Sequence, residues 1–208
     1  MQRYSQAKAA PDGTKAMLGL ERYLHECGLE ESLLHLIKLR ASQINGCACC
    51  LDMHWKDLKS IGEPDHRLYE LDAWEETSFY TDRERAALAW TDAVTKVAET
   101  HIPDELYNDV RKQFNEKELA DLTLAIATIN AWNRLNIAAR TDAGTYQVPK
   151  SENAKNSLMS LLDFRIPAAS RLRVVGMRKP TAYCCGAKYP LRARTCRSFL
   201  EEEISIVR

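Results

Sequence analysis

Three residues that could carry redox chemistry lie within eight positions of the chain, in the segment GCACCLDMH that begins at Gly46. Cys47 and Cys50 are three residues apart and His54 follows Cys50 by four, so on a helix all three share one face. Gly46 ends the preceding helical pattern, which places Cys47 at or near the start of the next helix. Free backbone amides and the helix dipole favour a thiolate there. Together with a histidine one turn away, they should lower a cysteine pKa below its reference of ~8.5.

A low-pKa thiol with a second thiol in reach is typical of a dithiol peroxidase or a disulfide oxidoreductase. One sulfur attacks a weak O–O or S–S bond, and the other resolves the product as a disulfide. Zinc is the alternative for Cys47, Cys50 and His54, although a structural zinc site needs a fourth ligand. Cys49, His35 or a cysteine of the C-terminal region could supply it, but none has a close ligand spacing. Cys49 points off the shared face and is interpreted as a packing residue.

The elements that must position these residues are predicted to be helices. Apolar residues recur at intervals near 3.6 through the first 147 residues, and no two-residue alternation is found. About seven helices are expected, opening at Asp12 or Thr14, at Ser32, near Cys47, at Pro64, at the capping box of Thr81 and Glu84, at Pro103 and at Asn115. The last is apolar on most of its circumference and should be buried centrally or between subunits.

Composition divides the chain into two parts. The 208 residues are 45% apolar and carry no net charge, which suits one domain with an appendage. Residues 1–147 hold 17 basic and 24 acidic residues, a balance of −7, whereas residues 148–208 hold 12 and 5, a balance of +7. We expect the second part to be an irregular, poorly ordered basic extension. Its few aromatic residues argue against a nucleic-acid partner.

The compartment is predicted from three features of the sequence. The polar start has no signal-peptide pattern, and no run of 18 apolar residues suggests a membrane span. The seven cysteines are an odd, clustered set rather than a disulfide framework. These features favour a cytoplasmic chain with a redox or metal site and without a membrane partner.

Three segments carry a resemblance to a known family: LIKLRASQINGCACCLDMHWKD, RLYELDAWEETSFYTDRERAALAWTDAV and KELADLTLAIATINAWNRLNIAAR. Over roughly Tyr4 to Tyr146 the sequence resembles the AhpD-like (alkyl hydroperoxidase) branch of the carboxymuconolactone decarboxylase family. The resemblance implies an all-α fold, a homo-trimer or homo-hexamer, and reduction of organic hydroperoxides or hydrogen peroxide without a cofactor. It also implies that Cys50 attacks the peroxide, Cys47 resolves it and His54 activates the attacking thiol. The electron donor would be a thiol or dithiol, such as a lipoyl or thioredoxin-like protein.

One position departs from that family. Members of the family have a glutamate of the proton relay twelve residues before the first cysteine, where this sequence has His35. Glu31 lies one helical turn before His35. We therefore expect His35 to lie beside His54. We also expect the His35→Glu substitution to raise the rate of peroxide reduction at neutral pH. Two other functions remain open: a carboxymuconolactone-type decarboxylase, whose branch of the family does not depend on this cysteine pair, and a non-catalytic redox-sensing or zinc-binding module.

Overall fold

In a computed structural model of the chain, which describes residues 1–148, all regular structure is helical and no strand occurs within that range. The elements are α1 (Gln6–Ala9), α2 (Pro11–Glu26), α3 (Glu31–Asn45), α4 (Ala48–Ser60), α5 (Asp65–Tyr69), the 3₁₀ turn η1 (Leu71–Ala73), α6 (Asp82–Thr95), α7 (Val97–Thr100), α8 (Asp104–Val110) and α9 (Glu116–Ala139). The predicted all-α class is confirmed.

The predicted capping box of α6 is present, and the structure adds a second one at the start of α9. Thr81 caps α6 by accepting a hydrogen bond from the backbone of Glu84, whose carboxylate accepts one from the backbone of Thr81. Asn115 and Glu118 make the same reciprocal pair at the start of α9. Each box satisfies two amides that would otherwise lack partners at the helix end.

Two predicted helix starts were wrong. α2 begins at Pro11 with Ala10 as its N-cap, not at Asp12 or Thr14, because a proline in the first turn is already held near the helical φ. The Thr14 hydroxyl instead donates to the carbonyl of Ala10. α3 is capped by Glu30 without a side-chain hydrogen bond, so Ser32 lies inside it. Helix α1 was not predicted, and η1 and α7 are separate short elements where the predicted fourth and fifth helices were expected to continue.

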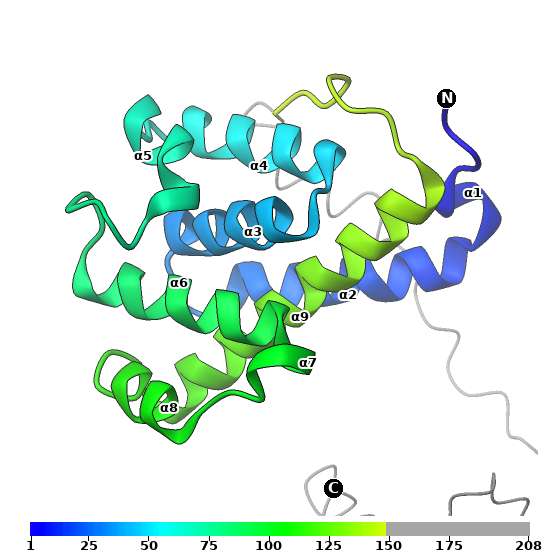
Figure 1. Cartoon of the computed structure of the whole chain (residues 1–208). Coiled ribbons are helices and arrows are strands. Elements are labelled where there is room, and N and C mark those ends of the chain that lie inside the picture. The colour runs from blue at the N-terminus through cyan, green and yellow to red at the C-terminus, as the bar shows by residue number, and fades with distance from the viewer. Residues whose placement is uncertain (149–208) are drawn as a thin grey trace, which may run out of the picture. The chain divides into compact units, whose positions relative to one another are not determined.

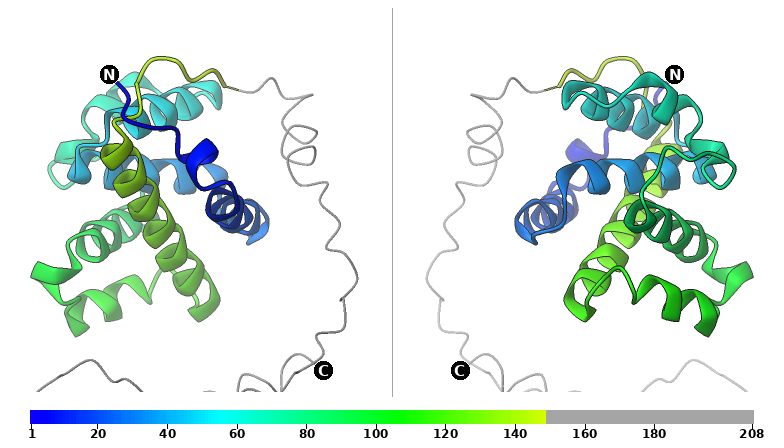
Figure 2. Two further views of the ribbon diagram at one scale, coloured as in Figure 1. Left: turned by 90° about the vertical axis from the view of Figure 1, so that its right-hand side faces the viewer. Right: turned by 90° about the vertical axis from the view of Figure 1, so that its left-hand side faces the viewer.

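Helix α3 is the centre of the described bundle. It contacts α4, α6 and α9, and Figure 1 shows it between α4 and α6 with α9 crossing them. Ten consecutive residues of α3, from Leu33 to Ser42, are buried, so the helix is covered on all sides. Figure 2 shows α9 running through the bundle, with α2 on one side and α6 and α8 on the other. This central place agrees with the apolar circumference of α9.

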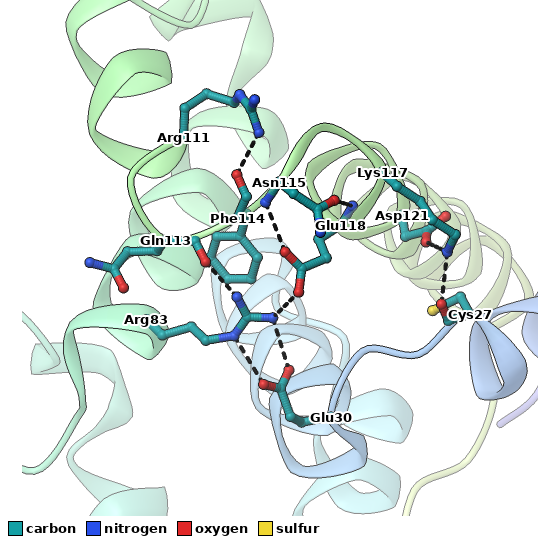
Figure 3. Close-up of polar contacts among 10 residues, drawn as sticks. All are labelled: Cys27, Glu30, Arg83, Arg111, Gln113, Phe114, Asn115, Lys117, Glu118 and Asp121. Atoms are coloured by element: carbon teal, nitrogen blue, oxygen red, sulfur yellow. Dashed lines mark hydrogen bonds and ion pairs between the residues drawn. The ribbon is translucent and has the colours of Figure 1, made fainter.

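A polar clamp holds three of these elements at one end of the bundle (Figure 3). The guanidinium of Arg83 on α6 lies 3.0 Å from the carboxylate of Glu30, just before α3, and 2.8 Å from that of Glu118 on α9. It also lies over the ring of Phe114, 4.0 Å from the ring centroid. The clamp therefore ties the start of α9 to the element that leads into the site.

The predicted boundary near residue 147 and the basic extension after it lie outside the described residues. Within the described part of the chain, no helix is both long enough and apolar enough to cross a membrane.

Candidate active site

A turn at Gly46 positions the first cysteine of the motif at the start of α4. Gly46 ends α3 with φ +67° and ψ 34°, a left-handed conformation in which glycine has no Cβ strain. The backbone N–H of Cys47 donates to the carbonyl of Ser42 at 3.0 Å, which closes the turn. Cys47 is then the N-cap of α4, as the spacing predicted.

The two thiols of the motif are buried in an apolar cluster. Cys47 is 1% exposed and Cys50 3% exposed, and both pack with Ala41, Ile129 and the half-buried Trp132. Both are free cysteines, so the pair is in its reduced dithiol form. An apolar surrounding raises the cost of a charged sulfur unless polar groups stabilise it.

Such polar groups are present, and they act differently on the two sulfurs. A hydrogen bond from the Cys50 thiol lowers the pKa of Cys47 to about 7, with help from backbone amides at the start of α4 and from Asn133 and against the effect of burial. The same hydrogen bond is the largest cause that raises the pKa of Cys50, and burial is the second. The pair therefore loses its first proton near neutral pH, and the resulting thiolate is on Cys47.

Three asparagines on α9 line this region. Asn136 donates from Nδ2 to the sulfur of Cys50 at 3.5 Å. Asn133 donates to Ser42 and accepts from Asn45, which also donates to Asn130. Their spacing of three places them on one face of α9. The sequence analysis did not assign them to the site, although polar residues at helical intervals in an apolar helix were a visible signal.

A second cluster, formed by His35, His54 and Asp57, joins α3 to α4. Oδ2 of Asp57 lies 3.5 Å from Nδ1 of His54 and 3.6 Å from Nδ1 of His35, and the two ring centroids are 5.9 Å apart. All three residues are at least nine-tenths buried. The structure therefore places His35 beside His54, and it adds a carboxylate that the sequence analysis missed.

Burial dominates the electrostatics of this cluster. It lowers the pKa of His35 to about 4, and it also lowers the pKa of His54, in both cases against the attraction of Asp57. The pKa of Asp57 stays below its usual value although burial acts to raise it, because His54 and Tyr146 stabilise the carboxylate. The cluster is thus a carboxylate between two neutral imidazoles near neutral pH.

The segment after α9 closes over the cluster. Tyr146 donates from its hydroxyl to Oδ1 of Asp57 at 2.7 Å, and its carbonyl accepts from Lys56 at 3.0 Å. The backbone N–H of Gly144 donates to Asp52 at 3.1 Å. Tyr146 is more than 80 residues from α4 in the sequence, so only the tertiary structure brings it to Asp57.

Two other predicted residues have different places. Glu31 reaches only the outer edge of His35, with Oε1 3.9 Å from Nε2, and its side chain is 65% exposed. Cys49 lies half-buried on the first turn of α4, and burial raises its pKa. Within residues 1–148, His35, His54 and Asp57 are the one set of three potential metal ligands whose atoms all lie within 4.8 Å of one another, and no cysteine belongs to it.

Sequence comparison places this site in a family. Residues 11–93 match the carboxymuconolactone decarboxylase family. The uncharacterized protein YdfG of Bacillus subtilis (strain 168) is 43% identical over 137 residues, which cover 66% of this chain and 93% of YdfG. The chain belongs to the carboxymuconolactone decarboxylase family.

One solved structure places the chain in the AhpD-like branch of that family, and a second shares its fold. A protein of unknown function from Agrobacterium tumefaciens, named as a candidate antioxidant defence protein AhpD, is 43% identical and superposes with a TM-score of 0.68 over 70% of this chain and 100% of that chain. The alkylhydroperoxidase AhpD core of a peroxidase-related protein from Ralstonia eutropha JMP134 is 18% identical, with a TM-score of 0.61 over 70% of this chain and 80% of that chain. The second likeness shows the fold alone. Family and fold support a peroxidase-related or decarboxylase-type enzyme.

Proposed function

We propose that this protein is a thiol-dependent peroxidase that reduces organic hydroperoxides or hydrogen peroxide through a Cys47–Cys50 dithiol–disulfide cycle. The observation that carries the proposal is the thiol pair itself. Cys47 caps α4, and the neighbouring Cys50 thiol lowers the pKa of Cys47 to about 7 within an apolar cluster. A thiolate next to a second thiol is what reduction of an O–O bond and resolution of the product require.

The first half of the cycle breaks the O–O bond. The Cys50 proton passes to the Cys47 thiolate, and the Cys50 sulfur then attacks the outer peroxide oxygen. Two electrons pass from sulfur to oxygen and the O–O bond breaks. Cys50 becomes a sulfenic acid, and the leaving alkoxide or hydroxide takes the proton from Cys47 and departs as an alcohol or water.

The second half forms the disulfide. Cys47, again a thiolate, attacks the Cys50 sulfur and expels hydroxide, which leaves as water after it takes up a proton. An external thiol or dithiol then reduces the disulfide with two electrons and two protons. A lipoyl or thioredoxin-like protein is our proposed donor, and a homo-trimer or homo-hexamer is the proposed assembly.

Asn136, which donates to Cys50, and His54, which follows Cys50 by one helical turn, support the role of Cys50 as the attacking sulfur. His54 is the general base that we propose for the Cys50 thiol, and Asp57 lies 3.5 Å from its Nδ1 and orients the ring. The Asn136 amide stabilises negative charge on Cys50 when the proton leaves. The low pKa of Cys47 identifies the resting thiolate and does not by itself identify the attacking sulfur.

The decarboxylase alternative is less well supported because no decarboxylation step needs two adjacent thiols that share a proton. Peroxide consumption with a dithiol donor tests the proposal. Wild type should turn over, whereas Cys50→Ser and Cys47→Ser should fall to the rate of the donor alone. Cys49→Ser is the matched control and should remain active. Equal rates in wild type and Cys50→Ser would refute a dithiol peroxidase.

A further inference from the structure

The histidine–aspartate cluster contains two buried nitrogen atoms whose lack of hydrogen bonds is not explained by a role in proton transfer. Nδ1 of His35 and Nδ1 of His54 are both buried, and neither has a hydrogen-bond partner among the described residues. Buried polar atoms in folded proteins nearly always have a partner. Both nitrogens face the same carboxylate oxygen, Oδ2 of Asp57, at 3.6 and 3.5 Å. Two imidazoles and one carboxylate therefore converge on one point.

We propose that His35, His54 and Asp57 form a binding site for one divalent transition-metal ion of the Zn²⁺ type. Zinc bonds of ~2.1 Å at tetrahedral angles hold neighbouring ligand atoms about 3.4 Å apart. The two oxygen–nitrogen distances already match that spacing, and all three ligand atoms lie within 4.8 Å of one another. A small rotation of the rings completes a three-ligand site with one open position.

The chemistry of the ligands selects the class of metal. Imidazole nitrogen suits zinc, cobalt, nickel, copper and iron, whereas magnesium and calcium prefer sites made of oxygen alone. The ligand set differs from the one considered from the sequence, in which Cys47 and Cys50 were joined to His54. The cysteines are outside the cluster, so their redox cycle does not need to release a ligand.

The residues around the cluster make the kinds of contact that hold metal ligands in place. Tyr146 donates to Oδ1 of Asp57, which orients the carboxylate and leaves Oδ2 directed at the histidines. Glu31 lies 3.9 Å from Nε2 of His35, the nitrogen that a metal on Nδ1 leaves protonated. The positive charge of buried Lys38 opposes a cation nearby, but its ammonium lies 2.6 Å from the carboxylate of Glu21, which offsets that charge.

The full-length chain carrying Cys47→Ser and Cys50→Ser gives a direct test, because the dithiol itself can bind zinc. Titration calorimetry should show one strong Zn²⁺ site per chain. Co²⁺ should give the visible absorption of a tetrahedral site, and that band should disappear in His54→Gln. Asp57→Asn or His35→Gln should weaken Zn²⁺ binding by more than about 100-fold, because loss of an outer contact alone costs about 10–100-fold. His66→Gln, on α5, is the control and should bind normally.

Three results would overturn the site: no strong Zn²⁺ binding, a Zn²⁺ affinity of the Asp57→Asn and His35→Gln variants equal to that of the parent chain, or a cobalt spectrum unchanged in His54→Gln. If a variant fails to fold, nitrogen NMR of the unsubstituted histidines decides, since Zn²⁺ must shift Nδ1 of His35 and His54. A bound ion would occupy the nitrogen of His54 and should therefore inhibit peroxide reduction. Binding is measured without peroxide, so either proposal can fail alone.

Discussion

Asp57 lies one turn after His54 on α4, and its Oδ2 is 3.5 Å from Nδ1 of His54. The resemblance to AhpD-like proteins leads one to seek the relay carboxylate on the preceding helix, where this sequence has His35. The structure supplies a carboxylate from α4 instead. His35 lies on the other side of Asp57, at 3.6 Å, so the carboxylate is shared between two imidazoles.

This arrangement reverses the effect expected for His35→Glu. A glutamate at position 35 would lie next to the buried carboxylate of Asp57, and two like charges in one buried site repel. We now expect His35→Glu to lower both the melting temperature and the peroxide reduction rate, more than His35→Ala does. Thermal unfolding and initial rates of the two variants measure this, and a faster His35→Glu enzyme would contradict it.

The two motif cysteines should form an intrachain disulfide when the protein is treated with peroxide. They lie within one turn at the start of α4, where opening the first turn is the main cost. In Cys47→Ser we expect a sulfenic acid on Cys50, because the resolving thiol is absent. Peptide mass mapping checks both results. A dominant bridge to Cys49, or a sulfenic acid on Cys47 in Cys50→Ser, would reassign the roles.

The reactivity of Cys47 should depend on pH with a midpoint near 7, the lowered pKa of this thiol. Alkylation requires the thiolate, so its rate should rise as pH increases through that value and level off above it. Cys50→Ala removes the main hydrogen-bond donor and should move the midpoint upward. Iodoacetamide labelling of each variant across pH measures the shift, and an unchanged midpoint would mean that the Cys50 thiol does not stabilise the thiolate.

The Tyr146 hydroxyl should matter for both stability and rate. Tyr146→Phe removes the 2.7 Å hydrogen bond to Asp57, and a hydrogen bond to a charged group contributes about 1.5–3 kcal/mol to the free energy of unfolding. The freed carboxylate also orients His54 less well, so the peroxide reduction rate should fall. Tyr107→Phe, which alters a 44% exposed tyrosine on α8, is the control. Denaturant unfolding and initial rates test both effects.

Arg83 should be the most sensitive charged residue on its side of the bundle. Arg83→Met breaks the two ion pairs in Figure 3, and the free energy of unfolding should fall by about 1–2 kcal/mol, since the side chain is only 26% exposed. The exposed pair of Lys112 and Asp109 offers a comparison, and Lys112→Met should change stability by less than about 0.5 kcal/mol. Similar losses in both variants would show that the clamp adds nothing beyond a surface pair.

The sequence was sufficient for the local features of the site. The helical period, the capping box at Thr81 and the glycine before Cys47 all depend on residues within a few positions of one another. The position of Cys47 at the start of α4 follows from the same short-range rules. His54 shares the helix with Cys50, so its separation by one turn was fixed as soon as that segment was helical.

Only the tertiary structure decided which distant residues meet at the site. Asp57 looked like an ordinary polar residue of a helix until the packing of α4 on α3 buried it against His35. Tyr146 and Asn136 come from the far end of the described chain, and no spacing rule connects them to α4. Burial also set the pKa values of these groups, because the loss of water around a charge depends on every element that covers it.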